Sequence, residues 1–158
     1  MGIKAQFTMS DVERYIDTFL AAVEEKQVVR LQQLGEICVN YAKNVPLGQG
    51  FEDQTGNLRS SIGYVVFVDG FAVHGKYEQA PAKHPGLGDV YNGAEVGRAL
   101  AERVGKETTG VSLVVTAGME YATYVEAKGR DVLTGAELLA EKLLPDMIRR
   151  LSKSISKI

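Results

Sequence analysis

Residues 62–78 have the sequence IGYVVFVDGFAVHGKYE, and this stretch decides the fold. Two runs rich in β-branched and aromatic residues, 62–69 and 71–78, meet at the pair Asp69-Gly70. Asp-Gly between two such runs is a strong hairpin signal, because both central positions of the tight turn need positive φ angles. The stretch therefore predicts two antiparallel strands joined by a two-residue turn.

A third strand is predicted for residues 111–117, where apolar residues alternate along the chain and one face is expected to be core. Residues 79–93 contain two prolines and three glycines and predict an inserted surface loop. A loop of this length is uncommon in a compact domain unless it has a function. A short helix is expected at about 94–104.

A long helix is predicted for residues 10–44, which are followed closely by Pro46. Ser10 and Glu13 have the spacing of a capping box at its start. Apolar residues recur at steps of three and four, first as Val12, Ile16, Phe19 and Val23, and later as Leu31, Leu34, Cys38 and Tyr41. This spacing places them along one stripe of a helix.

The apolar stripe is interrupted by polar residues at positions 24–27. Either a bend at this point or a helix whose first half leaves the domain would explain the interruption. A continuous helix of this length would span about 50 Å, which exceeds the width of a domain of this size. The overhang would need a partner, and this is the first indication of assembly.

A final helix is predicted for residues 134–154, with a second capping box at Thr134 and Glu137 and an expected kink at Pro145. The order of elements is helix, hairpin, helix, strand, helix. This order predicts an α+β fold in which a small antiparallel sheet packs on the long N-terminal and C-terminal helices. We expect one domain over residues 1–158, with residues 1–9 flexible.

The composition is that of an ordinary globular domain, with 158 residues, of which 45% are hydrophobic and 24% charged. The net charge of −2, with both signs interspersed, argues against nucleic acid as the main partner. No apolar run approaches the roughly 20 residues that span a bilayer. The N-terminus lacks the apolar segment of a secretory signal, so a cytoplasmic protein is expected.

Residues that commonly carry chemistry are few and scattered. His74 lies on the second predicted strand, His84 lies in the loop, and neither has a metal ligand at a suitable spacing. Cys38, the only cysteine, falls on the apolar stripe and is expected to be buried. An enzyme would have to combine His74 with a distant acid, Glu120 or Glu126. We therefore expect no enzymatic activity, no metal and no cofactor.

The segment at positions 53–62, DQTGNLRSSI, combines a Thr55-Gly56 turn with apolar Leu58 and Ile62, which are spaced to share one side of a helix. Arg59 points elsewhere. The spacing predicts a single helical turn that anchors the hairpin to the core.

A second segment, YATYVE at positions 121–126, is expected to place its two tyrosines, Tyr121 and Tyr124, inward together with Val125. It would present Glu126. This arrangement also predicts a core anchor beside a turn.

Three motifs occur in one order: YAKNVP at 41–46, TGNLRSSI at 55–62 and YATYVE at 121–126. With helices before and after them, they resemble the small tail-completion or neck (head–tail joining) proteins of long-tailed bacteriophages and prophages. The residues that carry the resemblance are Thr55, Gly56, Leu58, Arg59, Ile62, Tyr121, Ala122, Tyr124, Val125 and Glu126. The family commonly has one residue between this glutamate and the next glycine, whereas here two residues separate Glu126 from Gly129.

The resemblance implies a non-enzymatic virion structural protein without a cofactor. Its partners would be other copies of itself in a ring, often a hexamer, and other phage neck or tail proteins. It would be made in the bacterial cytoplasm and end in the virion neck or tail. The candidate interface residues are Phe19 and Val23 on the long helix and His84 and Pro85 in the loop.

The alternative hypothesis is a prophage-derived or host binding module. It would capture a peptide or a small ligand on its sheet, on a surface lined by Tyr64, Phe67, Tyr77 and Tyr124.

Overall fold

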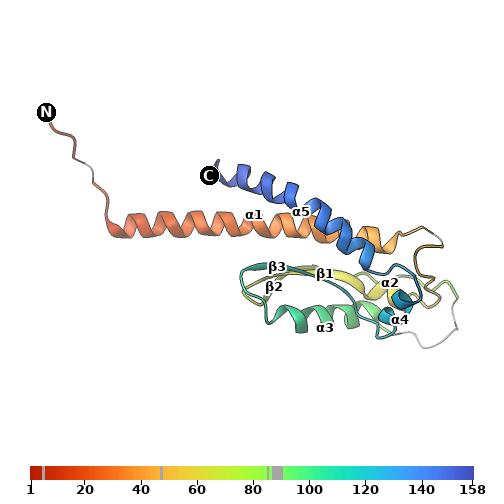
Figure 1. The fold of residues 1–158 in the computed structure, drawn as a ribbon. Coiled ribbons are helices and arrows are strands. Elements are labelled where there is room, and N and C mark those ends of the chain that lie inside the picture. The colour runs from red at the N-terminus through yellow and green to blue at the C-terminus, as the bar shows by residue number, and fades with distance from the viewer. Residues whose placement is uncertain (5, 47, 85, 87–90) are drawn as a thin grey trace.

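The computed structural model describes residues 1–4, 6–46, 48–84, 86 and 91–158. Its architecture is α+β, as the sequence predicts (Figure 1). Pro85 and most of the remaining positions between 85 and 90 lie outside the described residues. The elements in chain order are α1 (Met9–Lys43), α2 (Asn57–Ser61), β1 (Ile62–Val68), β2 (Phe71–Lys76), α3 (Gly93–Gly105), β3 (Val111–Ala117), α4 (Ala122–Ala127) and α5 (Thr134–Ile155).

The three strands form one antiparallel sheet in the order β2-β1-β3, with β1 in the centre. The predicted hairpin turn is confirmed, since Asp69 and Gly70 have φ angles of 49° and 80°. Positive φ at both positions matches the twist of a two-residue hairpin. The pairing of β1 with β2 shifts register between Val66 and Phe67, while β3 pairs with β1 along its whole length.

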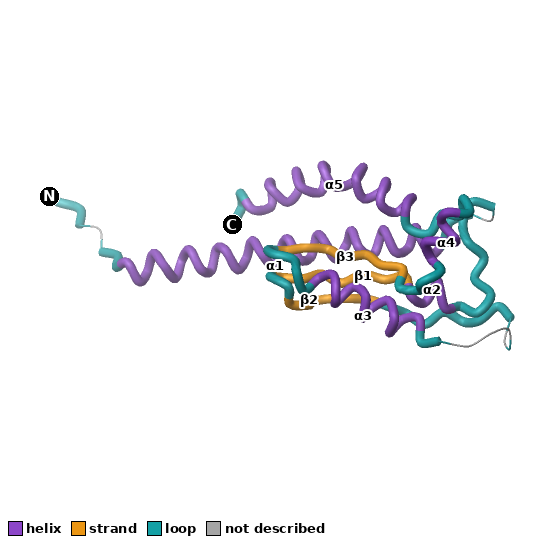
Figure 2. The backbone as a smooth tube through the Cα atoms, turned by 60° about the horizontal axis from the view of Figure 1, so that its bottom comes forward, coloured by secondary structure: helices purple, strands orange, loops and turns teal. Residues whose placement is uncertain are grey.

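Helices cover both faces of the sheet, as Figures 1 and 2 show. α1 packs on one face, α3 packs on the other, and α5 runs back along α1. Because side chains alternate along a strand, β1 divides its residues between two cores. Ile62, Tyr64 and Val66 join the core under α1, whereas Val65 and Phe67 join the smaller core under α3. The expected core face of β3 is confirmed, since Val111, Leu113, Val115 and Ala117 pack against the core under α1. The opposite face of β3 is also partly covered, because Thr116 is buried on the α3 side.

α3 approaches the sheet closely because its inner face carries only small residues. Gly93, Gly97, Ala101 and Gly105 recur every four residues and are all buried. A methyl group at Gly97 would collide with the backbone oxygen of Ser61, and one at Gly105 would collide with the ring of Phe67. The sequence pattern predicts this helix but not the face of the sheet that it covers.

α1 is one continuous helix of 35 residues, and at 1.5 Å per residue it is about 52 Å long. Its first half extends beyond the sheet (Figures 1 and 2). The second of the two explanations for the interrupted stripe therefore holds. The predicted cap at Ser10 is wrong by two residues: Thr8 is the N-cap, and its hydroxyl and backbone N–H exchange hydrogen bonds with Asp11.

α5 contains Pro145 without a break in the helix, and the helix is arched in Figure 2. The predicted capping box at Thr134 and Glu137 is wrong. The N-cap residue is Leu133, and its side chain makes no capping hydrogen bond. Among the described residues, no helix is both long enough and apolar enough to cross a bilayer.

The close approach of α3 gives a stability prediction. Gly97→Ala should raise the helix propensity of α3 by about 1 kcal/mol, but the added methyl group meets rigid backbone at Ser61. We expect the clash to dominate and the free energy of unfolding to fall by about 1–3 kcal/mol, as measured by urea denaturation. Arg103→Ala, at an exposed position of the same helix, is the control and should change stability little. A Gly97→Ala variant as stable as the wild type would contradict this packing.

Candidate functional site

The segment at positions 53–62 forms a joint built around the buried carboxylate of Asp53. Its Oδ1 accepts a hydrogen bond from the backbone N–H of Gly56 at 2.9 Å, and its Oδ2 accepts one from the N–H of Arg59 at 2.6 Å. These bonds satisfy N–H groups at the start of α2 that have no partner within the helix. The predicted single helical turn at this place is therefore confirmed.

The side chain of Arg59 connects α2 to the end of α1. Its guanidinium donates a hydrogen bond to the backbone oxygen of Lys43 and lies 5.4 Å from the ring centre of Phe51. A cation at the C-terminus of a helix also complements the helix dipole. Leu58 and Ile62 point the other way and are buried in the core, as the sequence predicts. We call this arrangement, from Asp53 to Ile62, the motif joint.

The YATYVE segment at positions 121–126 forms most of α4, but its side chains are not arranged as predicted. Ala122 is the buried residue of this helix, whereas Tyr124 is 63% exposed and Tyr121 is 40% exposed. Val125 is half-buried. The prediction of two inward tyrosines is wrong, because in this short helix Ala122 faces the core and Tyr124 faces outward. The ammonium group of Lys128 lies 5.1 Å from the centre of the Tyr124 ring.

Glu126, the last motif residue, caps α5 from outside that helix. Its Oε1 accepts hydrogen bonds from the backbone N–H of Leu133 at 3.3 Å, from the N–H of Thr134 at 2.8 Å and from the Thr134 hydroxyl at 2.5 Å. Burial alone would raise the pKa of Glu126, but these hydrogen bonds outweigh it, and the net pKa is lowered. The carboxylate thus also lies at the positive end of the α5 dipole.

The segments at positions 53–62 and 121–126 face each other across a depression of about 330 Å³, lined in part by Thr55, Leu58, Tyr121 and Val125. Burial, followed by the negative charge of Asp53, raises the pKa of Tyr121, and a hydrogen bond with Thr55 opposes the shift. The motif residues in α2 and α4 therefore lie next to each other, and they hold the end of α1 and the start of α5.

His74 and Glu126, which an enzyme would have to combine, have different polar partners: His74 contacts Tyr64, and Glu126 contacts the start of α5. Its Nε2 lies 3.1 Å from the hydroxyl of Tyr64, which donates a hydrogen bond to Glu36 at 3.0 Å. Lys76 forms an ion pair with Glu36 at 3.4 Å. Burial, together with the hydrogen bond and charge of Glu36, raises the pKa of Tyr64 to about 12. This hydroxyl keeps its proton near neutral pH and ties α1 to the hairpin.

The sheet does not offer the aromatic binding surface that the alternative hypothesis requires. Tyr64 and Phe67 are 0% and 1% exposed, and Tyr77 is half-buried with its hydroxyl 2.6 Å from that of Thr116. Tyr124 belongs to α4 and to none of the three strands.

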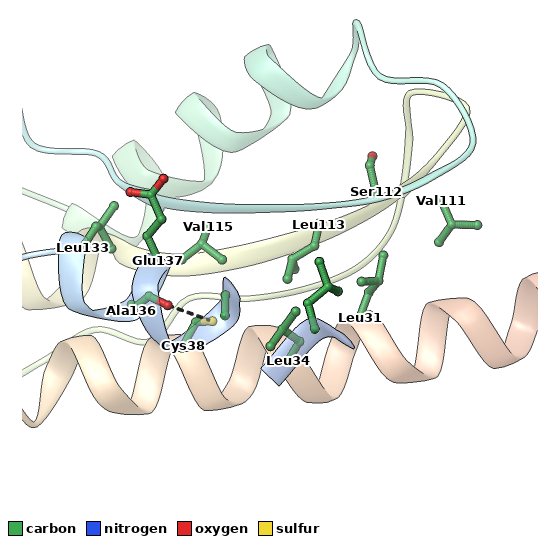
Figure 3. Close-up of a pocket in the computed structure, with 12 residues that line it drawn as sticks. Leu31, Leu34, Cys38, Val111, Ser112, Leu113, Val115, Leu133, Ala136 and Glu137 are labelled. Atoms are coloured by element: carbon green, nitrogen blue, oxygen red, sulfur yellow. Dashed lines mark hydrogen bonds between the residues drawn. The ribbon is translucent and has the colours of Figure 1, made fainter. Parts of the chain in front are cut away.

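A largely apolar groove lies between α1, α5 and β3, as Figure 3 shows. Its volume is about 510 Å³, and Ser112 and Glu137 are its polar lining residues. A second hollow of about 170 Å³ shares Leu31, Val111 and Leu144 with it and continues to Ile148 and Leu151. We call the two together the groove. The apolar residues of its larger part are Leu31, Leu34 and Cys38 from α1, Val111, Leu113 and Val115 from β3, and Leu133, Ala136, Ala140 and Leu144 from α5 and its cap.

Cys38 lies in the floor of the groove. It is buried, and its Sγ is 3.7 Å from the backbone oxygen of Ala136 (Figure 3). Burial raises the pKa of this thiol, so it stays protonated and behaves as a small apolar side chain, as expected.

The N-terminal part of α1, residues 9–24, is here called the arm. α5 ends beside α1 just after the arm, where Lys26 donates a hydrogen bond to Ser154 at 2.9 Å. In the arm, Tyr15 is 69% exposed, Ile16 49% and Leu20 57%, and the candidate interface residues Phe19 and Val23 are half-buried.

The remaining candidate interface residue within the described chain is His84. Its side chain is exposed, and its backbone N–H donates to the oxygen of Gln54 at 3.1 Å. Over the described ranges, no group of three or more His, Cys, Asp or Glu side chains is arranged to hold a metal ion.

Comparisons of this chain with protein-family models, with curated proteins and with solved structures found no match. The structural features that bear on function are therefore the motif joint, the groove and the arm.

The cap made by Glu126 predicts a pH-dependent stability. A carboxyl group whose pKa is lowered by folding stabilises the protein fully above its unfolded pKa, and this contribution is lost as the pH falls through the folded value. We expect Glu126→Gln to lower the free energy of unfolding at pH 7 by about 1 kcal/mol. The difference from the wild type should shrink as the pH falls below the usual value of 4.5.

Chemical denaturation of both proteins between pH 7 and pH 3 measures this difference. Glu120→Gln, at an exposed position just before α4, is the matched control and should show a much smaller difference. An effect of Glu126→Gln that grows toward acid pH would contradict the proposed cap.

Proposed function

We propose that this protein is a non-enzymatic structural subunit of a bacteriophage or prophage virion, and that it assembles into a ring in the neck or tail. Support for the phage assignment comes from the order of the three motifs along the chain. Further support comes from their structural roles, because the motif joint and the Glu126 cap hold the long helices in place. Such a subunit acts through shape and requires no reaction.

The observation that carries the assembly part of the proposal is the arm. A helix that leaves its domain lacks the tertiary packing that stabilises most helices in proteins. The arm nevertheless keeps apolar side chains such as Tyr15, Ile16 and Leu20 on its surface. Full burial of one large aliphatic side chain contributes about 1.5–3 kcal/mol, so contact with a neighbouring subunit would stabilise both the arm and the assembly.

The mechanism would be geometric. The sheet packs between α1 and α3, and the motif joint holds the C-terminal end of α1, the helix whose other end is the arm. Identical subunits that each place one surface on a different surface of the next subunit form a closed ring when the rotation between them closes.

The groove favours a second candidate function. A largely apolar hollow of about 510 Å³ with few polar groups falls within the size range of ligand sites in proteins. A binding module would therefore use the groove beside α5 for its peptide or small ligand and would not use the sheet face.

The proposal predicts the mass of the protein in solution. Light scattering across a concentration series should show a defined multiple of 17.2 kDa, because the uncovered arm gains contacts on association. Negative-stain electron microscopy of the same sample should show annular particles. A chain that stays at 17.2 kDa throughout, alone and with candidate neck and tail proteins, would contradict the ring.

The phage part of the proposal has its own measurement. Antibodies against the chain should label purified phage particles at the junction of head and tail. Particles that lack the chain would contradict the virion assignment even if rings form in solution.

A further inference from the structure

We propose that the arm of one subunit occupies the groove of a neighbouring copy of the same chain. This inference deepens the proposed function, since it assigns the contact between ring neighbours, and it rests on self-association of the chain. The proposed occupant of the groove is the segment at residues 9–24 of a second copy of the chain.

The arm carries the residue spacing that a groove-binding helix uses. Helices that bind in apolar grooves do so through anchors at positions i, i+3, i+4 and i+7. Ile16, Phe19, Leu20 and Val23 have this spacing, and Ile16 and Leu20 are about half exposed. The arm therefore presents a ready apolar edge.

The groove is open along the second half of α5. Leu144 and Ile148, which line it, are 40% and 56% exposed, although both are large aliphatic residues. β3 forms the opposite wall with Val111 and Leu113. A single helix edge inserted between α5 and β3 would cover the apolar residues of both walls.

The charges of the two surfaces are complementary. The arm carries four acidic residues, Asp11, Glu13, Asp17 and Glu24, against one basic residue, Arg14. Residues 142–155 of α5 carry four basic residues, Lys142, Arg149, Arg150 and Lys153, against one acidic residue, Asp146. The first half of α5 carries the acidic residues Glu137 and Glu141, so the positive charge lies on the C-terminal part of the helix. Opposite net charges on the arm and on this part of α5 steer the two surfaces together and disfavour pairing of like surfaces.

The arm cannot reach the groove of its own chain. Leu31, in the floor of the groove, and Ile16, in the arm, belong to the same continuous helix. Fifteen residues of straight helix hold them about 22 Å apart. The occupant must therefore come from another molecule. If that molecule is a second copy of the chain, a single kind of contact covers the exposed arm of one copy and the open groove of the other.

A complementation experiment tests this contact. The arm variant carries Ile16→Gln and Leu20→Gln, and the groove variant carries Leu144→Gln and Ile148→Gln. Glutamine forms helices well and leaves the charges unchanged, and all four positions are exposed. Each variant alone should lose association, with a dissociation constant raised at least about 100-fold.

An equal mixture of the two variants retains one intact contact, the arm of the groove variant in the groove of the arm variant. Light scattering should therefore show a 1:1 complex only on mixing. The matched control, Phe71→Gln with Val73→Gln, removes two exposed apolar residues from the edge strand β2 and should assemble like the wild type.

The outcomes separate this inference from the proposed function. If the wild type assembles but the mixture stays monomeric, or if either variant assembles normally, the arm–groove contact is overturned and the ring proposal stands. If the wild type stays monomeric across the series, both alone and with candidate neck and tail proteins, both are overturned, and the groove is left to a partner other than this chain.

Discussion

β1 lies between two strands and between two helices, and its side chains alternate between the two cores that these helices close. Tyr64 is fully buried toward α1 and Phe67 toward α3. Loss of either core would expose one full face of the central strand. The position of α1, and with it the direction of the arm, depends on this burial on both sides, because α1 packs directly on β1.

The sequence is most informative where local geometry decides the structure. Asp69-Gly70 demands positive φ, and Leu58 with Ile62 demands one buried side, so the hairpin and α2 could be predicted from the residues alone. The cap of α5 could not be predicted, because Glu126 reaches α5 from another helix and no local spacing reveals such a partner. The sheet-facing side of α3 was missed because its inner residues are mostly glycines, which give no apolar periodicity. Their four-residue spacing was the available signal.

The candidate site also has a part that could be predicted from the sequence and a part that could not. The motifs could be found in the sequence, and their residues now have structural roles: Arg59 holds the end of α1, and Glu126 holds the start of α5. The groove could not be predicted, because it arises where α5 packs on α1 and leaves a wall of β3 uncovered. The spacing of an apolar residue such as Leu144 along its helix is the same whether or not a neighbouring element covers it.

α1 is held by the core and by α5 as far as Lys26, since Val28 and Leu31 pack against the core and Lys26 contacts Ser154. The part before Lys26 is about 25 Å long at 1.5 Å per residue. A helix held at one end acts as a lever, so a tilt of about 5° near Lys26 displaces the tip by about 2 Å, given that length. Small adjustments of the helix at Lys26 would therefore become larger displacements at Met9. A subunit built in this way can meet neighbours at slightly different angles without rearranging its sheet.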